Sequence, residues 1–358
     1  MSDIYRILAV NPGSTSTKVG LFENEKLVVE KKLAHSTEEI SKFKSIIDQV
    51  DFRRSVIDEF LKENQVNPQE LSAVVGRGGL LKPLKSGTYR VSQPMIEDLK
   101  SCKYGEHASN MGALIAYSFH KAFGIPAFIV DPVVVDEMQD IARYSGIKEI
   151  SRTSVWHALN VFSVVRQTCN NLKMDIDKEN FVVAHIGGGV TVSAIQQGRC
   201  IDVSNGLEEG PFTPERAGSL PTLELVKLCF SGKYTQAEIK KMLVGKGGLV
   251  SYLGTSNMQE VAEKINQGDS YADEVFSAMG YQIAKTIGSY VAVLKGKVTR
   301  IILTGGGAHN KVLLSKITDY IESFAPVHIV PGEDELLALA QGGLRVLRNE
   351  TTPREYSA

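Results

Sequence analysis

Three turns in the 358-residue sequence have the residue types needed to bind an anion, and each follows a hydrophobic stretch. They are Asn11 to Thr17, rich in hydroxyl side chains, and the glycine runs Gly187 to Gly189 and Gly305 to Gly307. Glycine permits positive φ and lets backbone N–H groups approach an anion without a Cβ in the way. Taken singly, each is more readily explained as a plain tight turn. Together they predict a nucleotide site in which two turns bind phosphates and the third lies near the adenosine.

The same turns and the overall charge disfavour several classes of protein. No turn carries a Walker A or Gly-x-Gly-x-x-Gly pattern, which disfavours P-loop and dinucleotide-binding folds. The 40 basic and 41 acidic side chains nearly balance. The short basic runs, Arg53-Arg54 among them, are therefore interpreted as solvated surface, and no nucleic-acid partner is expected. The four cysteines show no metal-site spacing.

The hydropathy pattern predicts a cytoplasmic protein without a membrane partner. The first residues lack a basic flank followed by an apolar segment, which a secretory leader would show. No window approaches about 18 uninterrupted apolar residues, the length of a membrane-spanning helix.

Two similar series of secondary-structure elements position the three turns. In the first half we expect strands over residues 4–10, 18–23 and 26–34, a helix over 53–63, a strand over 71–75, a helix over 107–123 and a strand over 127–130. In the second half we expect strands over 181–186, 190–196 and 200–204, helices over 221–230 and 271–294, a strand over 300–303, a helix from 310, a strand over 327–330 and a terminal helix from 334.

The two halves match when residues 7–23 are shifted by 174 positions onto 181–197, which sets Asn11 opposite His185. Residue identity is poor, and chance similarity between two common α/β patterns is the alternative. The matching element order predicts an α/β fold of two related domains, residues 1–150 and 151–335, each with a mixed sheet flanked by helices and facing the other across a cleft. The C-terminal helix, about 336–358, is expected to pack back on the first domain.

Two stretches carry a family resemblance: Leu8 to Lys18 and Val183 to Ser193 resemble the signature stretches of the acetate and butyrate kinases, the acetokinase family. Further matches lie at 75–79, 104–110, 130–133, 152–160, 210–218 and 331–335. The resemblance implies actin-like (ribonuclease H-like) folds for both domains, the first on the carboxylate side and the second on the nucleotide side. The Asn-Pro-Gly of the first loop, the shorter chain and the Ala-Ser-Asn after His107 resemble the butyrate branch more than the acetate branch.

The resemblance implies Mg²⁺-dependent phosphoryl transfer from ATP to a short-chain carboxylate, butyrate or isobutyrate. Such an acceptor is already anionic, so the reaction needs no general base. Its difficulty is to hold two anions together and to neutralise the charge on the transferring group. A guanidinium remains charged and can grip two oxygens at once. Arg77 and Arg216, which resemble the paired arginines of the family, are expected in this role.

The resemblance assigns roles to several other residues. Asp131, at the end of an apolar strand, is expected near Mg²⁺ together with one glutamate of 333–335, for which Glu333 is chosen and Glu335 is the alternative. Asn11 and His185 are expected to steady the γ-phosphate from opposite sides, and His107 to lie near the carboxylate. The expected nucleotide contacts are Asn11, Ser14, Ser16, Lys18, His185, Gly187, Gly188, Gly189, Gly305, Gly306, Gly307 and Asn310.

One departure from the family and three alternative functions stay open. Acetate kinases carry two histidines where this chain keeps only His157, so Arg152 or Thr153 is expected to cover for the other. The alternatives are a kinase for branched acids such as isobutyrate or isovalerate, an actin-like ATP-binding protein, and a sugar kinase. The last would need a carboxylate base, and no candidate other than Asp131 is apparent. The family also implies at least a homodimer and closure of the two domains.

Overall fold

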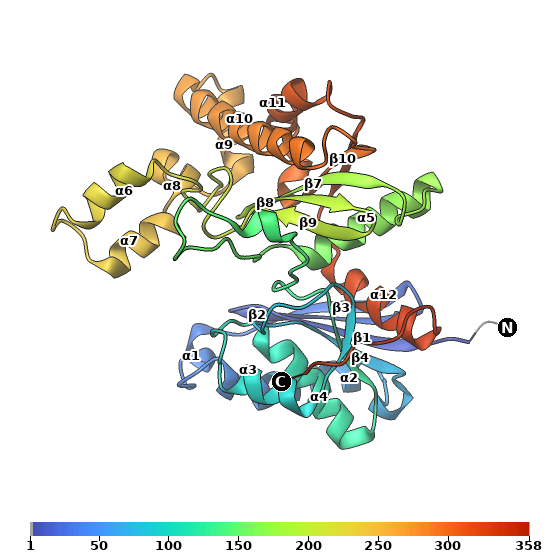
Figure 1. Cartoon of the computed structure of the whole chain (residues 1–358). Helices are drawn as coiled ribbons and strands as arrows, with labels where there is room; N and C mark the ends of the chain where they lie inside the picture. Colours follow the sequence, from blue (N-terminus) through green and yellow to red (C-terminus); the bar gives the residue numbers. More distant parts are fainter. Residues whose placement is uncertain (1–2, 358) are drawn as a thin grey trace. The chain divides into compact units, whose positions relative to one another are not determined.

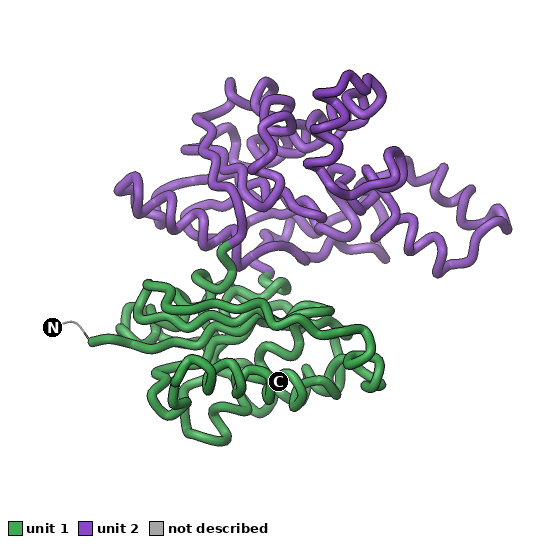
Figure 2. The backbone as a smooth tube through the Cα atoms, turned by 180° about the vertical axis from the view of Figure 1, so that it is seen from behind, with its two compact units in different colours: residues 1–135, 334–358 green, residues 136–333 purple. Residues whose placement is uncertain are grey.

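The chain divides into two compact units in the computed structural model, which describes residues 3–357. Unit 1 combines residues 1–135 with 334–358, and unit 2 contains residues 136–333 (Figure 2). Each unit has its own hydrophobic core. No helix within residues 3–357 is long and apolar enough to cross a bilayer.

Unit 1 is built on a six-stranded mixed sheet with the order β3-β2-β1-β4-β6-β5 (Figure 1). β1, β2 and β3 form an antiparallel meander, β4 and β6 continue parallel to β1, and β5 is antiparallel to β6. The strands are β1 (Arg6–Pro12), β2 (Ser16–Glu23), β3 (Lys26–Ala34), β4 (Ala73–Arg77), β5 (Thr88–Arg90) and β6 (Ala127–Val130).

Helices cover both faces of this sheet (Figure 1). They are α1 (Thr37–Ile40), α2 (Val50–Glu63), α3 (Gln93–Lys100), α4 (Asn110–Phe123) and α12 (Glu335–Leu347). α4 and α12 both pack on β1, β4 and β6, which explains why Ile7 to Val10 form an unbroken apolar run rather than an alternating one. Gly76 lets α4 approach β4 closely, because a Cβ there would overlap the carbonyl group of Gly112.

Unit 2 is built on a five-stranded mixed sheet with the order β11-β10-β7-β8-β9. Its strands are β7 (Asn180–Ile186), β8 (Val190–Gln196), β9 (Arg199–Val203), β10 (Arg300–Gly305) and β11 (Val327–Pro331). Its helices are α5 (Ala158–Leu172), α6 (Thr222–Cys229), α7 (Gln236–Leu243), α8 (Gly248–Leu253), α9 (Met258–Asn266), α10 (Ser270–Val293) and α11 (Lys311–Ile321). α5 and α10 pack on the sheet.

The two sheets share one topology. β1, β2, β3, β4 and β6 correspond in order and direction to β7, β8, β9, β10 and β11. β1 and β7 have seven residues each and begin at Arg6 and Asn180, which is the 174-residue offset expected from the sequence. The predicted pair of mixed sheets flanked by helices is confirmed. α5, which follows β6, packs in unit 2, and α12, which follows β11, packs in unit 1.

The unit boundaries lie at 135–136 and 333–334, where the sequence predicted 150–151 and 335–336. The segment 136–150 is bonded to unit 2: the Gln139 N–H donates to the Ile201 carbonyl oxygen at 2.9 Å, and Arg152 Nη1 donates to the Ala142 carbonyl oxygen at 2.7 Å. At the second boundary, Asp334 accepts a hydrogen bond from the Leu337 N–H and so caps α12.

Candidate functional site

Asn11, Arg77 and Glu335 form a polar cluster in unit 1. Asn11 lies near the end of β1, Arg77 ends the neighbouring parallel strand β4, and Glu335 begins α12. One Glu335 oxygen accepts from Arg77 Nη1 and the other from Asn11 Nδ2, while Arg77 Nη1 lies 3.4 Å from Asn11 Oδ1. The Arg77 and Glu335 side chains are 22% and 15% exposed. The cluster therefore fixes the guanidinium at the strand ends while leaving part of it open.

The loop between β1 and β2 carries the predicted phosphate contacts Ser14, Ser16 and Lys18. Ser14 and Lys18 are exposed and Ser16 is half-buried. The backbone N–H groups of Ser14 and Thr15 have no hydrogen-bond partner in the described part of the chain. These donors and hydroxyls are suited to an anion.

His107 precedes α4, which begins at Asn110 rather than at His107 as the sequence predicted. Its Nδ1 accepts a hydrogen bond from the Ser109 N–H at 3.2 Å and lies 2.8 Å from Ser109 Oγ. Partial burial and the Arg77 guanidinium lower the pKa of His107. The neutral ring therefore keeps its proton on Nε2, where it can donate to a carboxylate oxygen.

Asp131 lies directly after β6 and is 1% exposed. Its φ of 37° is left-handed, and its Oδ1 accepts from the Gly87 N–H at 2.6 Å. The carboxylate is thus tied to the turn before β5, a tie that the sequence did not reveal. No group of three or more His, Cys, Asp or Glu side chains within residues 3–357 could hold a metal ion.

Magnesium does not require such a group, because it is often bound by one or two carboxylates together with substrate phosphates and waters. Asp131 and Glu335 in unit 1 and Glu333 in unit 2 supply hard oxygen donors of this kind. The donor chemistry present in the chain therefore fits Mg²⁺.

His185 is the centre of the corresponding cluster in unit 2, and it is 1% exposed. Its Nδ1 lies 2.8 Å from Asn160 Oδ1, and its Nε2 lies 3.1 Å from Glu333 Oε1. Because a carboxylate only accepts, the ring donates to Glu333 from Nε2. The His157 ring stacks on the His185 ring with centroids 3.8 Å apart, and His157 Nδ1 lies 3.0 Å from Thr191 Oγ1. The imidazole of His185 is held on three sides.

The two glycine turns of unit 2 pack against neighbouring backbone and side chains. Gly305 has a φ of 88°, and a Cβ there would overlap the Ile186 carbonyl group. A Cβ on Gly189 would overlap the Arg216 guanidinium, which lies over this turn and donates to the Gly206 carbonyl oxygen. Burial lowers the pKa of Arg216.

Asn310 is hydrogen-bonded within the protein, whereas Gly306 has free space beside it. Asn310 Oδ1 caps α11 by accepting from the Leu313 N–H, and its Nδ2 donates to the Met258 carbonyl oxygen. Gly306, by contrast, has open space where its Cβ would lie.

This chain is similar to known proteins over nearly its whole length. The model of the acetokinase family matches residues 126–330. Butyrate kinase 2 of Clostridium acetobutylicum is 52% identical over 353 residues, which cover 98% of this chain and 99% of the relative. The chain belongs to the acetokinase family. The family predicted from the sequence is confirmed.

Solved structures show the same fold. The acetate kinase of Porphyromonas gingivalis has a TM-score of 0.79 at 21% identity, over 96% of this chain and all of that one. A propionate kinase of Francisella tularensis subsp. tularensis has a TM-score of 0.74 at 20% identity, over 94% and 98% of the two chains. The predicted fold class is confirmed.

Arg152, expected to cover for the histidine that acetate kinases have and this member of the acetokinase family lacks, is fully engaged elsewhere. Its guanidinium donates to both Glu209 oxygens at 3.0 and 2.9 Å and to Asp202 at 3.0 Å. Thr153 accepts from Asn205 Nδ2 at 2.9 Å. Arg152 thus ties β9 and the following loop together, a structural task that its position in the sequence did not show.

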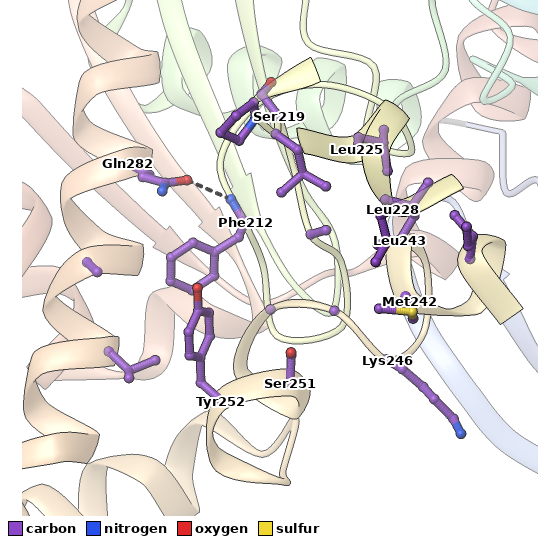
Figure 3. Close-up of a pocket in the computed structure, with 18 of the residues that line it drawn as sticks. Phe212, Ser219, Leu225, Leu228, Met242, Leu243, Lys246, Ser251, Tyr252 and Gln282 are labelled. Atoms are coloured by element: carbon purple, nitrogen blue, oxygen red, sulfur yellow. Dashed lines mark hydrogen bonds between the residues drawn. The ribbon is translucent and has the colours of Figure 1, made fainter. Parts of the chain in front are cut away.

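A cavity of about 560 Å³ lies among α6, α7, α8 and α10 of unit 2 (Figure 3). Its wall is mostly apolar, with Leu225, Leu228 and Leu243 pointing inward, and the Phe212 N–H donates to Gln282 Oε1 at its edge. None of the predicted site residues lines it. The wall of this cavity therefore includes none of the predicted nucleotide contacts.

The interpretation of Arg53 as solvated surface is wrong. Arg53 is completely buried on α2. It shares a helix face with Ile57, Phe60 and Leu61, four, seven and eight residues further on. This helical spacing was the available signal, because a basic residue within an apolar stripe faces the interior.

Proposed function

We propose that this chain is a butyrate kinase, which transfers the γ-phosphoryl group of ATP reversibly to butyrate to give ADP and butyryl phosphate. The observation that carries the proposal is the cluster in unit 1, where Arg77 is held at the strand ends by Asn11 and Glu335. The near full-length similarity to a butyrate kinase supports the choice of acid.

In the proposed reaction a butyrate oxygen attacks the γ-phosphorus directly, and the bond to the β–γ bridging oxygen breaks as ADP leaves. No phosphoenzyme is formed, and no general base is needed because the nucleophile is already an anion. Arg77 and Arg216 neutralise charge on the transferring group. His107 donates from Nε2 to a carboxylate oxygen and so orients the nucleophile.

The nucleotide phosphates are the proposed ligands of the turns. Asn11 donates to the γ-phosphate, and so does His185, whose Nε2 exchanges its bond to Glu333 for the phosphate oxygen. Ser14, Ser16 and Lys18 bind phosphate oxygens. Gly187, Gly188 and Gly189 offer backbone N–H groups. Gly305, Gly306, Gly307 and Asn310 are assigned to the adenosine side. The open space at Gly306 supports this assignment.

Magnesium, when bound, would neutralise phosphate charge and orient the phosphates. Asp131 and Glu333 are the proposed holders, with Glu335 as the alternative to Glu333. Asp131 Oδ1 is bonded to the Gly87 N–H, an arrangement that orients the carboxyl group.

The direct test is a panel of straight and branched acids from C2 to C6 with ATP and Mg²⁺, in which the acyl phosphate is trapped as its hydroxamate. Butyrate should give the highest kcat/KM, although one methylene discriminates by only about 1–3 kcal/mol. A preference for isobutyrate or isovalerate would show that the substrate is a branched acid rather than butyrate. ATP consumption indifferent to any added acid would overturn the proposal in favour of an actin-like ATP-binding protein.

We also propose that the chain works in the cytoplasm as at least a homodimer. Apolar side chains on and directly after α6 support self-association, since Leu223, Val226 and Phe230 are exposed, the last at 87%. Light scattering on the purified protein should give at least twice the chain mass, and Phe230→Asp should reduce it. A monomer at micromolar concentration would contradict the dimer.

A further inference from the structure

Arg53 lies beneath the loop that joins β1 and β2, with no part of its side chain exposed. Its Nη1 donates to the carbonyl oxygens of Gly13 at 2.8 Å and Ser16 at 3.1 Å, and its Nη2 donates to that of Ser14 at 2.9 Å. Its other partners are Thr17 Oγ1 and Gln49 Oε1. One guanidinium thus holds three carbonyl groups of a single loop.

The charge of Arg53 has no counterion among residues 3–357, because every hydrogen-bond partner is neutral. Burial lowers the pKa of Arg53 to about 10. An unpaired buried charge is costly to the fold. A tight turn alone needs no such group, so the buried charge points to an anion outside the loop.

Arg53 also determines which way the loop faces. The carbonyl groups of Gly13, Ser14 and Ser16 point to Arg53, and that of Thr15 accepts from the His35 N–H at 2.9 Å. All four carbonyl oxygens therefore accept hydrogen bonds from other residues of unit 1. The N–H groups of Ser14 and Thr15, two exposed residues, have no partner in the described chain. A loop whose carbonyl oxygens are all bonded, whose exposed residues keep unpaired N–H donors and which has a positive charge beneath it attracts an anion.

We propose that Arg53 is a positioning residue for phosphoryl transfer, which holds the loop from Gly13 to Thr17 with its donors toward the phosphate and adds a positive charge behind them. The inference rests on the proposed function, which gives Ser14 and Ser16 their phosphate contacts. Arg53 itself touches no substrate.

The first test replaces the planar guanidinium of Arg53 by an ammonium group, which keeps the positive charge. In Arg53→Lys one ammonium cannot reach three carbonyl groups. We expect kcat about 100-fold lower, the scale of a misplaced catalytic group, with KM for butyrate within about threefold. Hydrogen exchange at residues 14–17 should become faster. The matched control is Arg54→Met, because Arg54 is next on α2 but stacks on Phe119 and pairs with Asp58. Its kcat should stay within about threefold of wild type.

The second test keeps Arg53 and neutralises its charge with a carboxylate placed beside it. Gln49→Glu places a carboxylate where Gln49 Oε1 now accepts from Nε and Nη2 at 3.2 and 2.8 Å. Pairing the buried charge should leave the melting temperature unchanged or higher, whereas KM for ATP should rise about tenfold because the positive charge behind the loop is cancelled. A merely structural Arg53 would leave KM for ATP unchanged.

The inference is overturned if Arg53→Lys and Gln49→Glu both keep wild-type kcat and KM, or if Arg53→Lys loses no more activity than Arg54→Met of equal melting temperature. Should Arg53→Lys fail to fold, Gln49→Glu decides alone. The double variant Ser14→Ala, Ser16→Ala distinguishes a failure of the proposed phosphate contacts from a failure of the Arg53 inference. If this double variant is fully active, the proposed role of the loop fails; if only it is impaired, the loop keeps its role and Arg53 loses it.

Discussion

The two units place different chemistry at matching positions of one sheet topology. The second-to-last residue of β1 is Asn11, and that of β7 is His185. The turn that follows is rich in hydroxyl groups in unit 1 and consists of three glycines in unit 2. The common sheet determines where hydrogen-bond donors stand, and the individual residues determine whether a side chain or the backbone supplies them.

The units also differ in what holds their turns in place. In unit 1 charged side chains do so: Arg53 beneath the first loop, and the Arg77–Glu335 pair at the end of β4. In unit 2 close backbone packing holds the Gly305 turn against Ile186, whereas the Arg216 guanidinium lies over the Gly187 to Gly189 turn. Side-chain charge should therefore matter most for the turns of unit 1, and the absence of a Cβ for the Gly305 turn of unit 2.

Arg216→Ala should have the largest effect, because Arg216 is the charged group of unit 2 proposed to act on the transferring phosphoryl group. We expect kcat to fall about 10³-fold or more, as for other arginines that stabilise phosphoryl transfer. Steady-state kinetics with saturating ATP and butyrate measures it. Arg199→Ala, at an exposed arginine of the same unit, is the control. Near-normal turnover of Arg216→Ala would remove this arginine from the mechanism.

Asn11→Ala and His185→Ala test the matched positions. Each removes one hydrogen-bond donor, and we expect kcat about 10²-fold lower in both. His185→Gln, which keeps a donor near the position of Nε2, should recover part of the loss. If one alanine variant is inactive and the other normal, the two positions are not functionally equivalent.

Gly305→Ala should destabilise the protein by about 2 kcal/mol or more, because positive φ costs a residue with a Cβ about 1–2 kcal/mol and the added Cβ also overlaps Ile186. Urea unfolding measures the difference. Gly306→Ala is the matched control, since nothing lies within 4 Å of its Cβ position. Equal stability of the two variants would contradict the packing account of unit 2.

The smallest expected effect is on the pH dependence of the free energy of unfolding, through His35 of unit 1. Burial and the Arg53 charge, partly offset by Glu39, lower the pKa of His35, whose Nε2 lies 2.9 Å from Thr17 Oγ1. The unfolded chain therefore binds a proton more readily, so the free energy of unfolding should fall as pH drops below about 6.5. His35→Gln should reduce that slope. An unchanged slope would show that His35 titrates as in the unfolded chain.

Much of the fold was predictable because hydrophobic periodicity and turn residues are local signals. β3, β6 and β8 have the expected bounds, and α12 starts one residue after the expected position. β5, with three residues, and the helices α3, α5, α7, α8 and α9 were not expected. In β5 and α8 the hydrophobic pattern is too short to establish a period, whereas the 15-residue α5 was long enough and was missed.

The family motifs led to the site residues, but their partners depend on the folded chain. Glu335 lies 258 positions from the arginine to which it bonds, and Glu333 lies 148 positions from His185. No local pattern links residues at such separations. The pairing of each glutamate with a different cluster therefore became visible only in the structure.

The central claim is that Arg77 serves the reaction rather than the binding of ATP. Calorimetry of ATP binding together with single-turnover transfer to butyrate in Arg77→Ala tests it most directly. The account predicts a dissociation constant for ATP within about threefold of wild type and transfer slower by about 10³-fold or more. Lost ATP binding, or transfer at the wild-type rate, would contradict it.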